Sequence, residues 1–324
     1  MSRAAGADAK FIVVKRKTRL EELLVRYNTV QQAKFYIERL GADFGDYWLE
    51  NEVYQNAVSL AVSELEQQGR VQVLDREHVP SFLFGDHDIV VAIGPDGLVA
   101  GTLKYLDRQP LIGVNPEPQR WDGVLLPFTV GDLRLLIPEV LRGKRRVQPV
   151  TLAMAQINNG QCLYGVNDLF IGRKTHVSAR YEIKLEEHAE QQSSSGIIVS
   201  TGLGASGWLR SVLAGAAGIV SSATRQPLTL MPEDLDAAEE QEKGRLDWSA
   251  DSLYFTVREP FPSRTTAASI VFGQINGQRK LRITSQMPDD GVIFSDGVES
   301  DFLNFHSGLE ATIGPADRQG HLIV

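Results

Sequence analysis

The pattern of apolar residues changes near residue 145, and this change limits the possible folds more than any other feature. Before it, short β-branched runs such as residues 11–15 and 88–94 alternate with stretches whose apolar residues recur at helical spacing. After it, strand patterns dominate. Because alternating strands and helices are typical of a mainly parallel sheet, we predict an α/β N-terminal domain with such a sheet over residues 1–144, and a β-rich second domain over residues 145–324.

Composition excludes several classes of protein. The chain has 324 residues, of which 43% are apolar and 23% charged, so it can bury a large core. Its formal net charge of -8 argues against nucleic acid as a partner, because binding the phosphate backbone needs a basic face. A single cysteine, Cys162, excludes an internal disulfide and a cysteine zinc site. We expect Cys162 to be a small buried residue.

No segment has the pattern of a membrane span or a secretion signal. The most apolar stretch, residues 196–222, carries Arg210 near its centre and many Gly and Ser residues. The first ten residues lack the apolar region of a signal peptide. We therefore expect a cytoplasmic protein without a membrane partner. The acidic residues 233–245 are expected to form solvated surface.

Two Asn-Gly pairs mark expected turns in the β-rich part. They begin at Asn159 and Asn276, each between two strand patterns. Asn-Gly favours the two-residue turns of β-hairpins, so we predict a hairpin at each position.

A candidate site follows the strand pattern of residues 88–94. Asp96 comes directly after it, between Gly94 and Gly97, and a helical pattern begins at once. Ligands of open parallel sheets bind beyond the carboxyl ends of the strands, and helix N-termini favour phosphate. Glycine lets the backbone approach a ligand closely, and a carboxylate there suits a proton acceptor or a partner of a metal–phosphate complex. An ordinary Asp-Gly turn explains this fragment equally well.

The residues around Asp96, together with the strand pattern of residues 110–115, resemble the Gly-Gly-Asp-Gly-Thr block of the NAD kinase family. Three further blocks match in the family's order. Asn167–Asp168 resembles its Asn-Glu pair, and residues 195–208 resemble its strand followed by Ser-Thr-Pro-Thr-Gly-Ser-Thr-Ala-Tyr. Asp296–Gly297, with the strand after it, resembles its C-terminal Asp-Gly turn. The matches span roughly residues 85–318, and the first 80 or so residues agree only in α/β character.

The resemblance implies ATP-dependent phosphorylation of the 2′-hydroxyl of NAD, with Mg²⁺-ATP as donor and Asp96 as the catalytic proton acceptor. It also implies a nucleotide-binding first domain and a second domain for dinucleotide binding and homo-oligomer formation. Asn offers both a donor and an acceptor for the adenosine part, and Asp accepts two ribose hydroxyls. The implied binding residues are Gly94, Gly97, Asn167, Asp168, Gly204, Ser206, Gly207 and Trp208. No protein metal ligands are expected.

The phosphate loop departs from the family. Pro95 replaces a glycine and removes a backbone donor, and Leu98 replaces a threonine hydroxyl. Ser195 stands where the family has an acidic residue, and residues 116–123 replace its Gly-rich block. Kinases depend on positioned donors around the transferred phosphoryl group. A non-catalytic nucleotide-binding protein of the same fold, and a kinase for a sugar or lipid hydroxyl, are therefore the alternatives.

Two other hypotheses arise from single motifs. Residues 202–207 fit Gly-x-Gly-x-x-Gly after a strand pattern, which is typical of a dinucleotide-dependent oxidoreductase. The acidic residue expected about 20 positions later is missing. Arg258 and Arg264, in a proline-containing stretch, are candidates for binding ligand phosphate, and Trp208 can either lie against a ligand ring or pack in the core.

Overall fold

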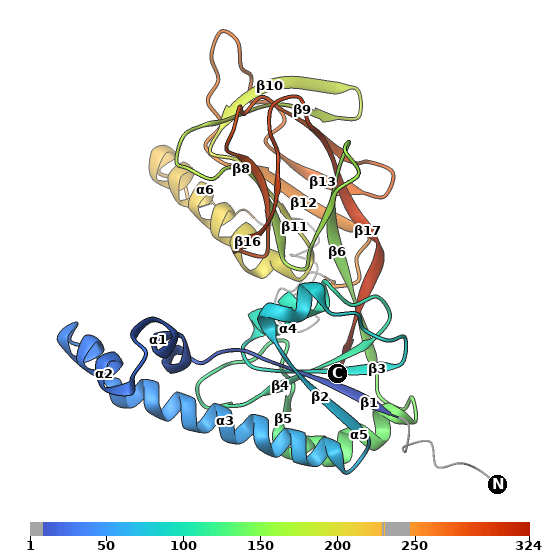
Figure 1. Ribbon diagram of the computed structural model, residues 1–324. Coiled ribbons are helices and arrows are strands. Elements are labelled where there is room, and N and C mark those ends of the chain that lie inside the picture. The colour runs from blue at the N-terminus through green and yellow to red at the C-terminus, as the bar shows by residue number, and fades with distance from the viewer. Residues whose placement is uncertain (1–8, 229, 231–246) are drawn as a thin grey trace. The chain divides into compact units, whose positions relative to one another are not determined.

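The structure is a computed structural model that describes residues 9–228, 230 and 247–324, so the acidic stretch 233–245 lies outside the described residues. The chain divides into two compact units (Figure 1). The first unit runs to Gln148 and also contains Gly320–Val324, and the second comprises Pro149–Gln319. The functions assigned above to the two parts stay predictions.

The first unit contains the predicted parallel sheet. Its strands, in spatial order, are β2 (Arg70–Asp75), β1 (Lys10–Lys15), β3 (Asp88–Ile93) and β4 (Pro110–Asn115). All neighbouring pairs run parallel. The short β5 (Phe128–Thr129) also pairs with β4. All six residues of β3 are buried, as expected for a strand that is covered on both faces.

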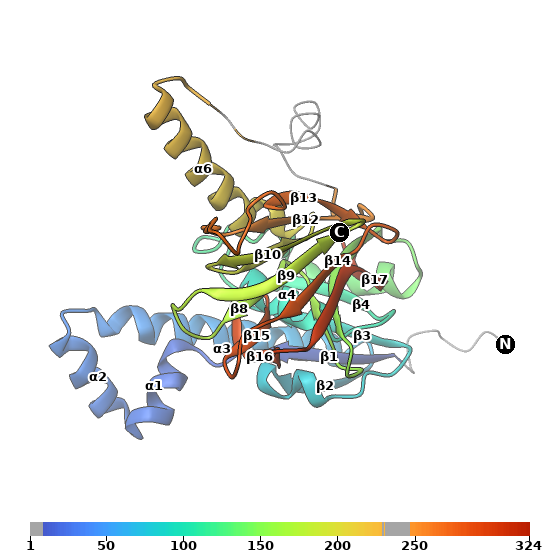
Figure 2. The same cartoon turned by 90° about the horizontal axis from the view of Figure 1, so that it is seen from above.

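Helices cover both faces of this sheet. The helical segments are α1 (Arg19–Tyr27), α2 (Val30–Arg39), α3 (Phe44–Glu66), η1 (Arg76–Ser81), α4 (Asp96–Leu103), η2 (Val130–Asp132) and α5 (Leu133–Leu141). Figure 1 shows α3 and α5 on one face and α4 on the other. The helices α1 and α2 pack at the N-terminal end of α3 (Figure 2) around Leu20, Ile37 and Phe44. Thr29 caps α2, because its side chain accepts from the N–H of Gln32.

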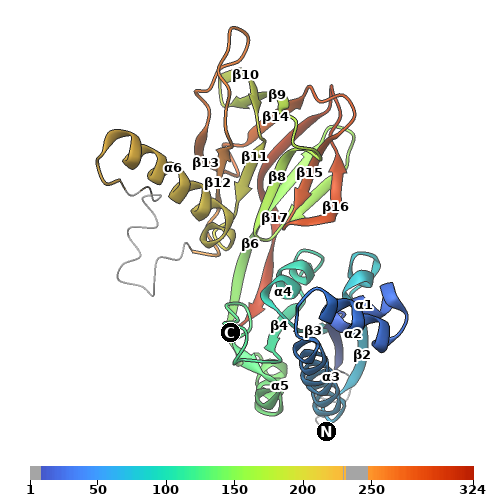
Figure 3. The same ribbon diagram turned by 90° about the vertical axis from the view of Figure 1, so that its left-hand side faces the viewer.

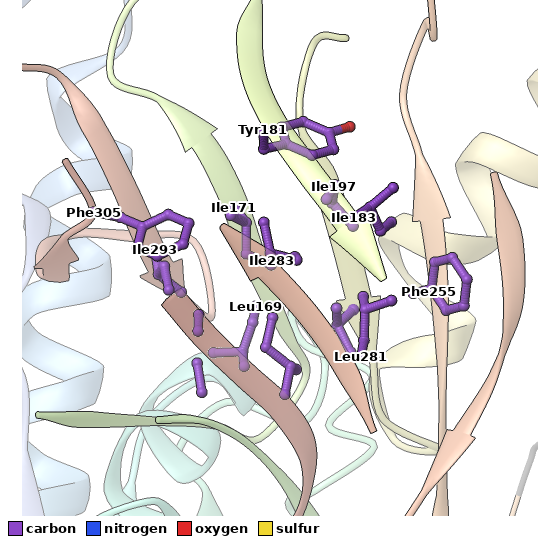
Figure 4. Packing of buried hydrophobic residues seen from close by; sticks show 14 of the residues in the cluster. Leu169, Ile171, Tyr181, Ile183, Ile197, Phe255, Leu281, Ile283, Ile293 and Phe305 are labelled. Carbon is purple, nitrogen blue, oxygen red and sulfur yellow. The ribbon is translucent and has the colours of Figure 1, made fainter. Parts of the chain in front are cut away.

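The second unit is a sandwich of two sheets. One contains β10 (His188–Ser194), β9 (Ala179–Leu185), β14 (Leu281–Ser285), β17 (Glu310–Ile323), β6 (Val147–Ile157) and β7 (Cys162–Gly165). The other contains β13 (Phe272–Asn276), β12 (Ser252–Val257), β11 (Ile197–Ser200), β8 (Asp168–Arg173), β15 (Gly291–Ser295) and β16 (Val298–Asn304). Figure 4 shows the apolar core between them, with Ile171 and Phe255 from one sheet facing Ile183 and Leu281 from the other.

The second unit also carries η3 (Gly204–Ser206) and α6 (Trp208–Thr224). Leu209 and Leu213 of α6 pack against Tyr254 of β12, and the rest of the helix runs outward (Figure 3). Among the described residues, no helix is long and apolar enough to cross a membrane.

One of the two predicted hairpins is confirmed. The turn at Asn159 joins β6 to β7, where Gln156 pairs with Cys162. The hairpin at Asn276 is wrong, because β13 and β14 belong to different sheets. The Asn276 side chain accepts from the N–H groups of Gln278 and Arg279, so the Asn-Gly turn passes the chain from one sheet to the other.

The prediction that Cys162 is buried is also wrong. Cys162 is exposed, whereas the next residue, Leu163, is buried in the sandwich core. Because side chains alternate between the two faces of a strand, burial of Leu163 in β7 directs Cys162 outward. A single cysteine carries no information about that register.

The last strand completes the core of the first unit. Leu322 of β17 pairs with Leu111 of β4, in parallel. Ile323, only 2% exposed, packs in the same apolar cluster as Ile112 and Leu136. The first sheet therefore depends on residues that follow the whole second unit in the sequence.

Ile323→Ala should lower the free energy of unfolding by about 2–5 kcal/mol, because it leaves a cavity in that core. Urea unfolding followed by circular dichroism measures the effect. Ile219→Ala is the matched control, because Ile219 is 72% exposed, and it should change the free energy by less than about 0.5 kcal/mol. Equal effects of the two substitutions would contradict this role of β17.

Candidate functional site

Asp96 is the first residue of α4 and follows β3 by two residues. Pro95 occupies the N-cap position of α4, where the first N–H groups have no partner within the helix, so its missing donor breaks no helix hydrogen bond. Leu98 is 1% exposed and therefore serves as a core residue of α4. Gly94 is buried, whereas Gly97 is exposed and a Cβ atom there would meet nothing within 4 Å. The backbone beside Asp96 is thus open to a ligand.

The carboxylate of Asp96 accepts hydrogen bonds from the segment that follows β4. The N–H of Leu125 donates to Oδ1 at 2.7 Å, and the N–H of Val124 approaches Oδ2 at 3.3 Å. A carboxylate has about four acceptor positions, so further ones stay available to a ligand hydroxyl.

Tyr54 of α3 fixes the end of β3. Its hydroxyl donates to the carbonyl of Ile93 at 2.7 Å and accepts from the N–H of Arg16 at 2.8 Å. Burial raises the pKa of Tyr54 to about 12, so the hydroxyl keeps its proton and stays a donor. Sequence reasoning missed this residue, because Tyr54 occupies the apolar face of α3 and resembles an ordinary core aromatic.

In the second unit, Asp296 positions the Asn167–Asp168 pair. Its carboxylate accepts from the N–H of Val166 at 2.9 Å, of Asn167 at 2.6 Å and, more distantly, of Asp168 at 3.3 Å. In return, the N–H of Asp296 donates to the carbonyl of Asp168 at 3.0 Å. The Asp-Gly turn at Asp296, which matched the family only as a sequence block, therefore fixes the backbone of the predicted adenosine-binding residues.

Thr201 and Gly204 contact the same turn. The hydroxyl of Thr201 donates to the carbonyl of Val166 at 2.6 Å and accepts from the N–H of Gly204 at 3.0 Å. A Cβ atom on Gly204 would lie 1.9 Å from the carbonyl oxygen of Asn167, which explains why this position needs glycine. The structure thus brings together Asn167, Asp168 and Gly204, as the resemblance implies.

The side chain of Asp168 is an unpaired buried acid. The residue is 8% exposed, and within residues 9–228 and 247–324 no hydrogen-bond donor contacts its carboxylate. Burial, and secondly the negative charge of Asp296, raise the pKa of Asp168 from 3.8 to about 7. A buried polar group without a partner is costly, and ligand hydroxyls can supply the missing donors.

Trp208 lies beside β8, the strand that begins with Asp168. Its ring stacks on Phe170 of β8 with centroids 5.7 Å apart, and the guanidinium of Arg258 lies 5.6 Å from the Trp208 ring centroid. Ser206 and Gly207 form the turn into α6, where the N–H of Gly207 donates to the carbonyl of Gly204. Arg258 therefore lies near the predicted dinucleotide residues, and Arg264 is exposed.

The oxidoreductase hypothesis is wrong in its structural premise. A dinucleotide fingerprint needs a parallel β–α–β unit. Here β11, which precedes residues 202–207, pairs antiparallel with both β8 and β12. Gly204–Ser206 form a 3₁₀ turn that packs against Asn167, and Gly202 lies against the backbone of Asp247. The glycines of this stretch serve close backbone packing.

The predicted residues form two groups, one in each unit. Gly94, Asp96 and Gly97 surround the end of β3, and the other residues surround the start of β8. Four groups that the sequence analysis gave no role contribute to the two sites: Tyr54, Thr201, Asp296 and the backbone N–H groups of residues 124 and 125. Of these, Thr201 and Asp296 had a signal, because both lie in blocks that resemble the family.

Asp168→Asn should stabilise the second unit, and the gain should grow with pH. The folded-state pKa of Asp168 lies above the unfolded value, so the folded protein loses stability as the pH rises from about 4 to 7. At pH 8 we expect the substitution to raise the free energy of unfolding by on the order of 2 kcal/mol or more, and at pH 5 by less. Urea unfolding at both values measures it, with Asp301→Asn as control. If the gain in the free energy of unfolding did not depend on pH, the interpretation of Asp168 as an unpaired buried acid would be wrong.

The chain is similar in sequence to mitochondrial NAD kinases, although no protein family model matches it. It is 25% identical over 324 residues to "NAD kinase 2, mitochondrial" of Rattus norvegicus, which covers 81% of this chain and 76% of the relative. The Homo sapiens protein of the same name is 25% identical over 334 residues, with 83% and 75% covered.

Solved structures show the same fold. The crystal structure of yeast NADH kinase complexed with NADH superimposes with a TM-score of 0.57 at 13% identity, covering 98% of this chain and 84% of that one. An NAD kinase from Archaeoglobus fulgidus in complex with ATP gives a TM-score of 0.54 at 14% identity, covering 97% and 93%. The likeness extends over nearly the whole chain, including the residues before Asp96 that resemble the family only generally.

Proposed function

We propose that the chain is a divergent member of the NAD kinase family and transfers the terminal phosphoryl group of ATP to the 2′-hydroxyl of NAD, which its similarity to NAD kinases supports. The observation that carries the proposal is the buried carboxylate of Asp168, which lacks a donor and lies next to Asn167. The adenosine ribose offers its 3′-hydroxyl as a donor to this carboxylate while its 2′-hydroxyl reacts, and an adenine ring offers both donors and acceptors to an amide. This pair therefore suits the adenosine part of a dinucleotide.

In this proposal Asp96 accepts the proton of the 2′-hydroxyl. The 2′-oxygen attacks the terminal phosphorus of ATP, and ADP leaves. The backbone N–H groups of Val124 and Leu125 orient the carboxylate for this step. The exposed backbone at Gly97 lies at the N-terminus of α4, which favours phosphate oxygens. Mg²⁺ would accompany ATP and neutralise charge on the transferred group.

Ser206, Gly207 and Trp208 complete the proposed dinucleotide site. The Trp208 ring, stacked on Phe170, offers an aromatic surface near Asp168, and Arg258 beside it offers a cation for the pyrophosphate. The cytoplasmic localisation and the homo-oligomer expected from the sequence stay predictions, and the mammalian relatives are named as mitochondrial proteins.

A catalytically silent dinucleotide-binding protein is the second candidate. The observation that favours it is the structure around Asp96: Pro95 offers no N–H, and Leu98 is buried where the family has a hydroxyl. Both losses remove donors to phosphate and leave the Asn167–Asp168 site intact.

The purified protein should convert NAD to NADP with Mg²⁺ and ATP, and Asp96→Asn should lower kcat by about 10²–10⁴-fold because the proton acceptor is lost. NADP formation is measured with an NADP-specific dehydrogenase. Asp86→Asn, which changes an exposed acid in the same unit, should leave kcat unchanged. Binding of NAD without turnover, seen as a thermal shift, would favour the silent protein, and no shift with NAD, NADP or ATP would contradict both candidates.

The affinity for NAD should rise with pH. The ribose 3′-hydroxyl donates to the ionised form of Asp168, so binding favours ionisation and lowers the pKa of this group. With a pKa of about 7 in the free protein, the affinity should rise about tenfold between pH 6 and pH 8. Isothermal titration calorimetry measures it, and Asp168→Asn should give a weaker and pH-independent affinity. A wild-type affinity that falls over this range would contradict the assignment.

A further inference from the structure

The segment that holds the Asp96 carboxylate comprises residues 116–126 and needs its own support. Its first part, residues 116–123, stands where the family has a Gly-rich block. Its near end is tied to Asn115: the side-chain amide of Asn115 donates to the carbonyl of Trp121 at 3.0 Å, and its oxygen accepts from the N–H of Glu117 at 3.0 Å. Gly123 has a φ of +65°, and a Cβ there would lie 2.7 Å from the Asn115 amide nitrogen. The segment therefore folds tightly back on Asn115.

A side-chain ion pair ties the segment to α3. One Arg120 nitrogen contacts both carboxylate oxygens of Asp46, at 2.7 and 2.8 Å. Asp46, in the first turn of α3, also accepts from Arg19 of α1 at 2.7 Å. The two arginines, Arg19 first, lower the pKa of Asp46, which therefore stays ionised at neutral pH. Arg120 is 25% exposed and Asp46 43% exposed, so water screens the charges, and the contact acts chiefly through its hydrogen-bond geometry.

The same helix thus reaches both sides of the turn that carries Asp96. Tyr54 of α3 binds the carbonyl of Ile93, just before the turn, and Asp46 of α3 binds Arg120, in the segment whose N–H groups hold the Asp96 carboxylate. The orientation of the carboxylate is therefore defined relative to α3 from two directions.

We propose that Arg120 and Asp46 are positioning residues for Asp96, acting through the backbone donors of Val124 and Leu125. The proposal rests on the proposed function for its catalytic consequence. Without Arg120, the segment keeps its contacts with Asn115 and Asp96 and the buried side chains of Leu125 and Leu126, but it loses its ion pair with α3, so its N–H groups shift relative to β3. A displacement of about 1 Å in a reacting group can cost 10²-fold in rate. The effect should fall on the chemical step, because the dinucleotide-binding residues lie in the other unit.

Arg120→Gln should lower kcat for NADP formation by about 10–100-fold and leave KM for NAD within about twofold. Arg120→Lys keeps the charge and should restore part of kcat. Asp46→Asn should lower kcat similarly, and the double variant should be no worse than the poorer single one, because both act through one contact. The matched control is Lys17→Gln, which breaks an exposed pair with Glu77 in the same unit and should change neither constant.

Hydrogen exchange gives a readout that needs no activity. The N–H groups of Val124 and Leu125 donate to Asp96, so they should exchange faster in Arg120→Gln and in Asp96→Asn, and at the wild-type rate in Lys17→Gln. Mass spectrometry of a peptide over residues 121–127 measures this, with a peptide from β8 as reference. If Arg120→Gln does not fold, Arg120→Lys provides the same comparison.

The outcomes separate the two proposals. If the wild-type protein forms no NADP, the proposed function fails, and exchange alone decides whether Arg120 fixes the segment. Unchanged exchange in the Arg120 variants would overturn the positioning role. A change in KM alone, or a double variant whose losses simply multiply, would also overturn it.

Discussion

Hydrogen bonds from backbone N–H groups to a half-buried carboxylate organise the candidate residues within each of the two units. Asp296 accepts from residues 166–168 and so fixes the Asn167–Asp168 turn. Asp96 accepts from residues 124 and 125 and is itself oriented by them. Hydrogen bonds to an ionised acceptor are stronger than neutral ones. The Asp296 carboxylate fixes the backbone around Asp168, whereas the backbone N–H groups of residues 124 and 125 orient the Asp96 carboxylate.

The family's phosphate loop is changed here without damage to the fold. Pro95 precedes α4, where an N–H would have no helical partner, and Leu98 adds to the core under that helix. The substitutions therefore gain packing and lose polar contacts to a ligand. Around Asp168 the opposite holds, because a buried acid without a donor lowers stability and keeps its acceptors for a ligand. Asp168 therefore costs stability in the second unit, whereas Pro95 and Leu98 fit the start of α4 in the first unit without such a cost.

Local sequence patterns predicted many of the helices and strands. They did not predict contacts between residues that are far apart in the sequence. The buried run of β3 and the parallel sheet follow from apolar spacing and turn residues. The prediction of a hairpin at Asn276 is wrong, because an Asn-Gly pair specifies a local bend and does not determine which sheet the next strand joins. Arg120 and Asp46 are 74 residues apart, and Asp296 and Val166 are 130 apart, so no window of sequence relates them. The family resemblance located Asp296 but gave it no role.

The path of β17 has a consequence for biogenesis. Its Leu322 and Ile323 complete the parallel sheet beside β4, although every residue of the second unit is synthesised before them. On the ribosome, the N-terminal unit therefore emerges before the strand that pairs with Pro110 and Leu111 of β4, and before the Ile323 side chain that fills its core. It can reach its final state only after the sandwich has been translated.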